Sequence, residues 1–268
     1  KELGENWEKE MIALNEQAPT ILRANSLKTS TKHLIEELKH ENVESFQVPG
    51  FENAVQLEEK KNVFLTSAFK DGFFEVQDAG SQKIGEFLDV KPGMRVVDAC
   101  AGAGGKTLHL AALMENKGQI IAMDIHGWKL AELKRRAKRA GAHNIETREI
   151  TDNKVIKRLH EKADRLLIDA PCSGLGVLKR NPDSKWKIDQ DFIDRIRKEQ
   201  ETILQDYSKI IKKGGKMVYA TCSILPSENN EQVENFLKNN PDFKLVKEEK
   251  VMPSTGFDGF YMALIERV

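Results

Sequence analysis

The sequence predicts an α/β fold with an open, mostly parallel sheet and a small α+β module ahead of it. From Ser81 onward, apolar runs of strand length alternate regularly with helix-like segments, which is typical of a doubly wound sheet. The last two strand-like runs are instead joined through Pro253, Gly256 and Gly259, which indicates a terminal hairpin. The predicted strands are 94–99, 119–124, 144–149, 165–169, 215–221, 243–247 and 259–265.

The first 75 residues lack this alternation. They begin with a short strand at 21–25, and a helix follows that continues through His40 and is capped by Thr29, Ser30 or Thr31. Further strand-like pieces are 45–48, 54–57 and 73–77. We therefore expect a small α+β module over residues 1–75 and a larger domain over residues 76–268.

Composition excludes several classes of protein. With 268 residues, 40% hydrophobic and 31% charged, the chain is typical of a soluble globular enzyme. No apolar run approaches the length of a membrane span, so we expect none. The chain opens on Lys-Glu-Leu-Gly-Glu-Asn, without an initiator Met or a signal peptide, and we expect a truncated piece of a longer protein.

The cysteine and charge content limits the cellular compartment, the metals and the partners that we expect. The three cysteines, Cys100, Cys172 and Cys222, are odd in number and far apart, which favours a reducing, cytoplasmic compartment over a disulfide framework. None lies at zinc-ligand spacing from a histidine, so we expect no metal. The formal net charge of zero does not by itself indicate a nucleic-acid partner, although neutrality can hide local basic patches.

The most informative short stretch is DACAGAGGKT, residues 98–107. It ends like a Walker A loop, but that motif needs a glycine where Cys100 stands. A dinucleotide fingerprint starting at Gly102 needs a third glycine where Thr107 stands. What remains is a strand, a glycine turn and a helix over 106–114 whose amide end can face a nucleotide-like cofactor.

Acidic residues follow four successive predicted strands. In an open parallel sheet the ligand lies beyond the carboxyl ends of the strands, so these acids should gather at one site. Asp124 follows the glycine turn at the distance typical of a residue that binds ribose hydroxyls. The four are Asp98, Asp124, Asp152 and Asp169. Together with the terminal hairpin, they favour the class I methyltransferase fold.

Two cysteines also follow strand ends beside this turn, Cys172 in Asp-Ala-Pro-Cys-Ser and Cys222 in Tyr-Ala-Thr-Cys-Ser. A lone cysteine is usually a small buried residue, but two at equivalent positions indicate chemistry. A methyltransferase acting on an amine would carry a polar-Pro-Pro-aromatic turn instead. Thiols fit methylation at carbon, because a thiolate added at C6 of a pyrimidine makes C5 nucleophilic and a second group then removes the C5 proton.

These motifs resemble bacterial RNA cytosine-5 methyltransferases of the Fmu/Sun group across nearly the whole chain. The matching stretches are 21–25, 76–82, the glycine turn, DAPCSGLGVLKRNPDSKW (169–186), YATCSILPSENN (219–230) and 258–261. The resemblance implies that Cys222 is the nucleophile, that Cys172 assists product release, that Asp169 polarises the ring at N3 and that Lys106 orients groups in the active site. It also implies S-adenosylmethionine bound by Cys100, Ala101, Gly102, Ala103, Gly104, Gly105, Lys106, Asp124, Asp152 and Asp169.

The expected partner is RNA, and the resemblance implies 16S ribosomal RNA. We expect an unpaired cytosine as the target, because a paired base must first be flipped out. Two departures stand out. The family usually has Ala-Pro where this chain has Gly102-Ala103, and Asp152 follows Thr151 rather than a glycine. Longer members carry an N-terminal RNA-binding domain related to NusB, which we expect to be absent here.

Three groups of residues are candidate RNA contacts. The basic segment 129–139 has apolar residues at helical spacing, so we expect a solvated helix face. In the loop after Cys172, basic residues flank Trp186, which either stacks on bases or packs the loop down; the sequence leaves both open. Arg23 and Asn25 would be structural by default, and the resemblance alone makes them RNA contacts. The basic residues of the loop are Lys179, Arg180, Lys185 and Lys187.

Two other functions compete with RNA methylation. A DNA cytosine-5 methyltransferase would use Cys172 as nucleophile and would leave Cys222 without a role. A non-catalytic RNA-binding factor of ribosome assembly would keep the fold without turnover, but it would not need Cys172, Cys222, Asp169 and Lys106 together. The sequence leaves open which nucleotide is modified and the oligomeric state.

Overall fold

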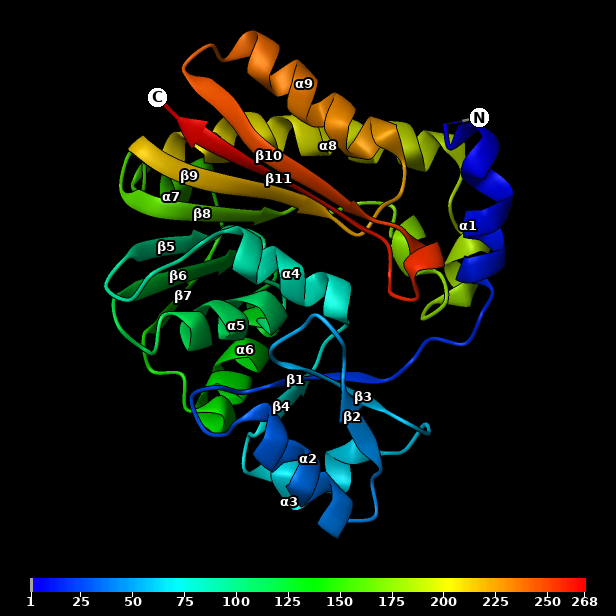
Figure 1. The fold of residues 1–268 in the computed structure, drawn as a ribbon. Coiled ribbons are helices and arrows are strands. Elements are labelled where there is room, and N and C mark those ends of the chain that lie inside the picture. Colours follow the sequence, from blue (N-terminus) through cyan, green and yellow to red (C-terminus); the bar gives the residue numbers. More distant parts are fainter. Residues whose placement is uncertain (1) are drawn as a thin grey trace.

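The computed structural model describes residues 2–268 and contains two sheets (Figure 1). The larger has the strand order β10-β11-β9-β8-β5-β6-β7. Strands β9, β8, β5, β6 and β7 run parallel, whereas β10 and β11 are antiparallel at one edge. Bounds are β5 Arg95–Asp98, β6 Gln119–Asp124, β7 Ile145–Glu149, β8 Ala163–Asp169, β9 Ile211–Thr221, β10 Phe243–Val251 and β11 Phe260–Arg267. The seven predicted strands and the terminal hairpin are confirmed.

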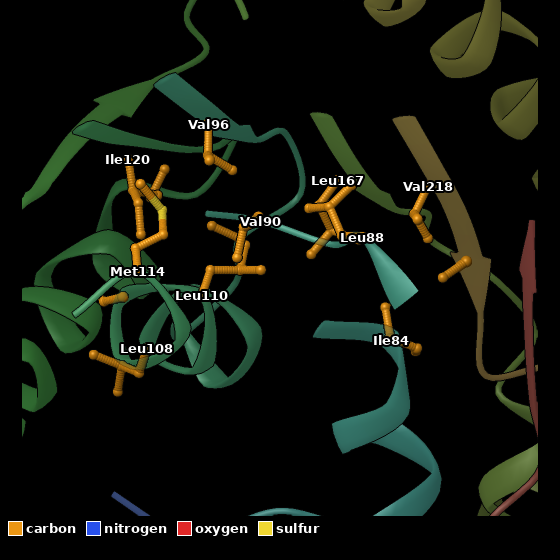
Figure 2. Close-up of a cluster of buried hydrophobic side chains, with 14 of the residues drawn as sticks. Ile84, Leu88, Val90, Val96, Leu108, Leu110, Met114, Ile120, Leu167 and Val218 are labelled. Atoms are coloured by element: carbon orange, nitrogen blue, oxygen red, sulfur yellow. The ribbon is translucent and has the colours of Figure 1, made fainter. Parts of the chain in front are cut away.

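Helices cover both faces of this sheet because its strands alternate their apolar side chains between two cores. In β5, Val96 packs into one core and Val97 into the other. The first core, shown in part in Figure 2, joins the strands to α4, α5 and α6 through residues such as Ile84 and Leu108. The second joins them to α7, α8 and α9. Bounds are α4 Ala79–Phe87, α5 Gly105–Leu113, α6 Gly127–Ala140, α7 Asn153–Lys157, α8 Gln190–Tyr207 and α9 Asn230–Asn239.

The small module has its own antiparallel sheet, in the order β2-β3-β1-β4. Among the three predicted caps, Ser30 begins the helix, because its Oγ accepts a hydrogen bond from the His33 amide at 3.2 Å. Leu22, Leu34 and Phe74 belong to a separate core beneath this sheet. Bounds are β1 Ile21–Ala24, β2 Ser45–Gln47, β3 Ala54–Leu57, β4 Phe74–Val76, α2 Thr31–His40 and α3 Ser67–Lys70.

The first helix, α1 (Trp7–Leu14), was not predicted from the sequence, and it packs against the turn at 253–255. The buried Glu10 carboxylate accepts hydrogen bonds from the Ser254 amide at 2.9 Å and hydroxyl at 2.7 Å. Within residues 2–268, no helix is long and apolar enough to cross a membrane. The 3₁₀ segments are Gly4–Asn6, Val63–Leu65, Leu175–Val177, Pro182–Trp186, Ser208–Ile210, Pro226–Glu228 and Pro253–Thr255.

Candidate active site

The carboxyl ends of the parallel strands bring most of the predicted site residues to one edge of the sheet. Asp98, Asp124 and Asp169 are the last residues of β5, β6 and β8. Cys172 and Cys222 follow β8 and β9, which are neighbours in the sheet. Parallel pairing of these strands is therefore the physical reason that residues distant in sequence share one site.

The glycine turn after β5 leads directly into α5. Gly102 and Gly104 have φ of +54° and +88°, values in the left-handed region that favours glycine. A Cβ on Gly104 would lie 2.5 Å from Leu133 Cγ, so no larger residue fits there. The Gly102 amide donates to Asp124 Oδ2 at 2.9 Å, which holds the turn beside the end of β6.

A pocket of about 360 Å³ opens beside this turn. Asp124 lies on its wall, where its Oδ1 also accepts a hydrogen bond from the His126 amide at 2.8 Å. Apolar side chains supply flat walls for an aromatic ring. The lining residues are Ala99, Cys100, Gly102, Asp124, Ile125, His126, Lys129, Ile150, Asp169, Pro171, Glu199, Ile203 and Tyr207. An acid for ribose hydroxyls beside apolar walls fits a nucleoside.

One wall of this pocket was not predicted from the sequence. Glu199, Ile203 and Tyr207 come from α8, and their four-residue spacing places them on one helix face. That spacing was the signal available in the sequence. Asp152, by contrast, does not line the pocket; its Oδ1 accepts a hydrogen bond from the Lys154 amide at 2.7 Å and begins α7. Its predicted role in cofactor binding stays a prediction.

An adjoining cavity of about 240 Å³ shares Cys100, Gly102 and Asp169 with this pocket and adds Asp98 and Lys106. The other lining residues are Gln77, Ser81, Ala101, Ala103 and Gly105. Asp98 is 1% exposed, and its Oδ2 accepts a hydrogen bond from Thr107 Oγ1 at 2.7 Å. Its Oδ1 has no partner among the described residues. Burial raises the pKa of Asp98 to about 7. Because Oδ1 is unpaired within the described chain, the site offers an unused polar atom to a ligand.

Lys106 and Asp169 form an ion pair within this cavity, with Nζ 2.7 Å from Oδ2. Burial works to lower the pKa of Lys106, but the Asp169 carboxylate outweighs it and the pKa lies above its usual value. Lys106 therefore stays charged beside the cysteines. Its Nζ also lies 5.8 Å from the centre of the Phe260 ring.

The two predicted cysteines are in direct contact, with their Sγ atoms 3.3 Å apart. With Cys172 as the hydrogen-bond donor, the contact holds the pKa of Cys222 below its ordinary value, against the opposing effects of burial and Asp169. Lys106 acts in the same direction as the hydrogen bond. The same contact, together with burial, raises the pKa of Cys172 well above its ordinary value. Cys222 is therefore the cysteine that ionises more readily.

A buried carboxylate, Glu228, fastens the two cysteine loops together. Its oxygens accept hydrogen bonds from the Ser173 amide at 2.8 Å, the Ser173 hydroxyl at 2.6 Å and the Ser223 hydroxyl. Gln200 also donates to Glu228 at 3.1 Å and to the Pro171 carbonyl at 2.9 Å. Because Ser173 and Ser223 directly follow the cysteines, this network fixes the separation of the two thiols.

The loop after Cys172 is held by two acids and ends in an exposed aromatic. Arg180 forms ion pairs with Asp78 at 3.0 Å and with Asp258. Trp186 is 81% exposed, and Lys185 Nζ lies 5.3 Å from the centre of its ring. The interpretation that Trp186 packs the loop down is therefore wrong, and the indole is free to stack on a ligand.

Two expectations about basic residues need correction. Arg23 and Asn25, candidate RNA contacts by resemblance, are only 1% and 3% exposed and bond to protein groups, so the structure contradicts a role on the RNA surface. The basic face of α6 is not wholly solvated either. Arg136 and Arg139 both form ion pairs with Glu75 of the small module, because the two domains pack together there.

The described part of the chain contains no group of three or more histidine, cysteine or acidic residues that could hold a metal ion.

Comparisons with known proteins agree with this geometry. The family described as "16S rRNA methyltransferase RsmB/F" matches residues 86–265, and the ferredoxin-like domain of RsmF/B-like methyltransferases matches residues 1–64. Ribosomal RNA small subunit methyltransferase B of Proteus mirabilis is 34% identical over 266 residues, which cover 98% of this chain and 62% of that protein. The chain thus spans about three fifths of the length of this relative.

Two crystal structures share the fold. The structure of PH0851 is 32% identical, with a TM-score of 0.94 over 98% of this chain and 63% of that one. The structure of NSun6 from Pyrococcus horikoshii with SFG is 22% identical, with a TM-score of 0.90 over 98% of this chain and 94% of that one. At that identity the second likeness supports the fold alone.

Proposed function

The chain belongs to the 16S rRNA methyltransferase RsmB/F family, and from that premise we propose that it transfers a methyl group from S-adenosylmethionine to C5 of an unpaired cytosine in RNA, with 16S rRNA as the substrate. The observation that carries the proposal is the contact between Cys172 and Cys222 beside the predicted cofactor pocket. Methylation of an amine would need no thiol, whereas methylation at C5 uses two groups of this kind.

The pocket residues fit S-adenosylmethionine. Asp124 would hold the ribose hydroxyls, the apolar walls the adenine, and the unused Oδ1 of Asp98 the amino group of the methionine part. When bound, the cofactor supplies an electrophilic sulfonium methyl. The turn over 100–106 would approach it through backbone amides.

Each side chain then has a defined task. The Cys222 thiolate attacks C6 of the cytosine, and the electrons of the 5,6 double bond move to C5, which takes the methyl group. Negative charge builds up at N3 during this attack. Asp169 would polarise the ring by donating a hydrogen bond from its protonated carboxyl to N3, and the Lys106 ammonium beside it would offset the charge. Removal of the C5 proton then restores the double bond and expels the Cys222 thiolate.

Cys172 is suited to remove that proton because its ionisation depends on the state of Cys222. While Cys222 is a thiolate, Cys172 donates to it and keeps its own proton. Once Cys222 is bonded to C6, its sulfur is an uncharged thioether and no longer repels a charge on Cys172. The Cys172 thiol then ionises more easily and can act as the base.

We also propose that residues 1–75 form an RNA-binding module and residues 76–268 the catalytic domain, and that the protein acts in the cytoplasm. The exposed Trp186 and its basic neighbours would extend the RNA surface onto the catalytic domain.

A denaturing gel tests the proposal after incubation of the protein with transcribed 16S rRNA and S-adenosylmethionine. We expect Cys172→Ala to accumulate a protein–RNA adduct and Cys222→Ala to form none. The wild type should yield 5-methylcytosine on nucleoside mass spectrometry. An adduct in Cys222→Ala but not in Cys172→Ala would contradict the assignment and support the DNA-type mechanism. S-Adenosylmethionine binding without adduct or methyl transfer on any ribosomal RNA would support a non-catalytic assembly factor.

A further inference from the structure

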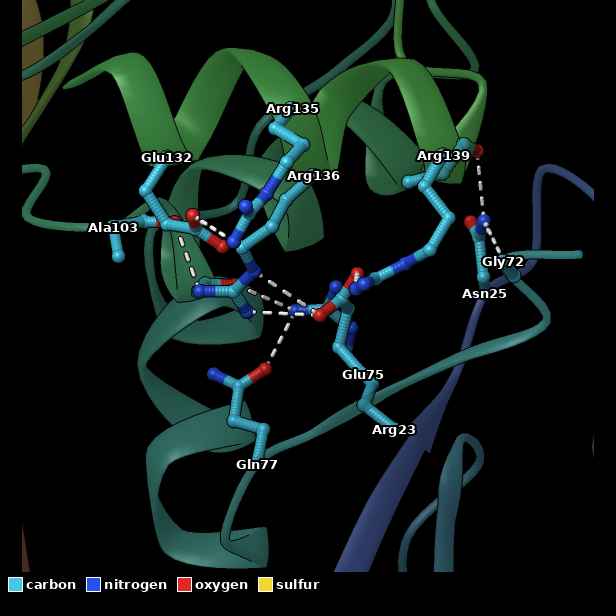
Figure 3. Close-up of polar contacts among 12 residues, drawn as sticks. Arg23, Asn25, Gly72, Glu75, Gln77, Ala103, Glu132, Arg135, Arg136 and Arg139 are labelled. Carbon is cyan, nitrogen blue, oxygen red and sulfur yellow. Dashed lines mark hydrogen bonds and ion pairs between the residues drawn. The ribbon is translucent and has the colours of Figure 1, made fainter. Parts of the chain in front are cut away.

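A cluster of charged and polar side chains lies at the interface between the small module and the catalytic domain (Figure 3). We call Arg23, Glu75, Gln77, Arg136 and Arg139 the joint cluster. Glu75 on β4 is 3% exposed and accepts from Arg136 Nη2 at 2.9 Å and from Arg139 Nη2 at 2.5 Å. Arg23 is the residue opposite Glu75 in the pairing of β1 with β4. Two guanidinium groups thus bind one buried carboxylate, and a third, that of Arg23, belongs to the residue opposite it on the neighbouring strand.

Two of these guanidinium groups also donate hydrogen bonds to the glycine turn. Arg136 Nη1 donates to the Ala103 carbonyl at 2.8 Å, and Arg23 Nη1 donates to the Gly105 carbonyl at 2.8 Å. Arg23 also donates to Gln77 Oε1 at 2.5 Å. Both carbonyls therefore have a charged donor. Ala103 and Gly105 themselves line the cavity that contains Asp98 and Lys106.

From these contacts we propose that Arg23 and Arg136 are positioning residues for the cofactor turn, with Arg23 held in place by Gln77 and Arg136 by Glu75. The inference relies on the proposed function only for the identity of the cofactor. Glycine-rich backbone loses much conformational entropy when it is ordered, so a turn with Gly102, Gly104 and Gly105 needs external contacts to stay in one shape. Donors bound to two of its carbonyls fix the direction in which its amides face the ligand.

Stability alone does not account for a cluster of this kind. Burying charged groups costs free energy that their attraction often only offsets, and apolar residues of similar volume commonly give equal stability. Hydrogen bonds from a guanidinium, however, have fixed directions that apolar contacts lack. The joint cluster therefore suits a role in orientation, and it makes the shape of the turn depend on the module strands β1 and β4.

The chain offers a matched pair of variants to test this. Arg136 and Arg139 lie on the same helix and bind the same carboxylate, but only Arg136 donates to the turn. We would compare Arg136→Met with Arg139→Met in the full chain, using S-adenosylhomocysteine as the probe in calorimetry. We expect the Kd of Arg136→Met to rise about tenfold, the usual effect of losing a hydrogen bond from a charged group, and that of Arg139→Met to change less than about twofold.

Two further measurements separate positioning from loss of stability. Thermal melting should show similar losses for both variants, because both leave Glu75 with one partner. Amide hydrogen exchange of peptide 98–107 should be faster only in Arg136→Met. Arg136→Lys, which keeps the charge and a donor, should recover part of the affinity and serves if Arg136→Met does not fold.

Equal Kd values for the two methionine variants, or an unchanged Kd in Arg136→Met, would overturn the proposal. These binding measurements need no RNA and no turnover. A failure of the proposed methylation would therefore leave this test intact, and the two failures can be told apart.

Discussion

Replacing Cys172 should change the acidity of Cys222 without touching Cys222 itself. The two sulfurs lie 3.3 Å apart, and the contact stabilises the Cys222 thiolate when Cys172 is the donor. Cys172→Ala removes that donor, so the pKa of Cys222 should rise. Cys172→Ser keeps a hydroxyl donor of similar size and is the matched control.

The size of the effect follows from the strength of the contact. A hydrogen bond to a charged group contributes about 1.5–3 kcal/mol, and a thiol is a weak donor, so we use the lower end. One pKa unit corresponds to about 1.4 kcal/mol, which gives a rise of about one unit. Near neutral pH the thiolate fraction then falls about tenfold, while each thiolate becomes about threefold more nucleophilic. Alkylation of Cys222 should therefore slow about threefold near pH 7 and become about threefold faster at high pH.

Alkylation by iodoacetamide across a pH series, quantified for each cysteine peptide by mass spectrometry, measures this. Cys100 is an internal reference, because burial holds its pKa well above the ordinary value and it should stay unmodified. An unchanged or lowered pKa of Cys222 in Cys172→Ala would refute the reasoning. Preferential alkylation of Cys172 at low pH in the wild type would reverse the roles of the two cysteines.

Three other outcomes follow from the structure. Glu228→Gln removes a negative charge that raises the pKa of both thiols, so alkylation of Cys222 should occur at lower pH. Single-turnover methylation should nevertheless slow about tenfold, because the two cysteine loops are held less firmly. An unchanged rate would contradict a positioning role for Glu228. Asp98 has a pKa of about 7 in the folded protein and 3.8 in the unfolded chain, so the folded protein keeps a proton that the unfolded chain loses. The free energy of unfolding should therefore fall as pH rises from about 4 to 7. In Asp98→Asn, the urea midpoint of unfolding should depend less on pH in this range. Trp186→Ala should weaken RNA binding about tenfold in filter or fluorescence assays, because one stacked base contributes about 1–3 kcal/mol. The affinity for S-adenosylhomocysteine should stay unchanged. RNA affinity equal to that of the wild type would show that the exposed indole does not stack on a base.

The sequence predicted the sheet and its functional edge because both depend on local signals. Apolar runs bounded by turns identify strands, and the rule that ligands lie beyond the carboxyl ends of parallel strands then brings Asp98, Asp124 and Asp169 together. The same rule places Cys172 and Cys222 past strand ends beside the cofactor turn, whereas their direct contact depends on the adjacency of β8 and β9 that the structure shows. None of these inferences required knowledge of how side chains pack.

Residues whose role depends on long-range packing could not be predicted in this way. Arg23 lies 82 residues before Gly105, and its exposed or buried state cannot be read from a short strand pattern. Glu228 lies in a polar stretch that looks like an ordinary surface turn, yet it is fully buried. For α6, the basic residues did indicate a helix face, but only the packing of the module shows that Arg136 and Arg139 leave the solvent.

Glu75 and Glu228 are two buried carboxylates that have similar roles in different parts of the site. Glu228 accepts hydrogen bonds from both cysteine loops. Glu75, on the module strand β4, accepts them from α6, and one of its two partners there, Arg136, also binds the cofactor turn. A buried carboxylate is costly unless all its lone pairs are used, so each arrangement is stable only while its donors stay in place. A shift of one cysteine loop or of the module would leave acceptors unpaired and raise the free energy steeply. The same property that makes these groups poor contributors to stability therefore makes them effective at fixing the geometry that the proposed C5 methylation requires.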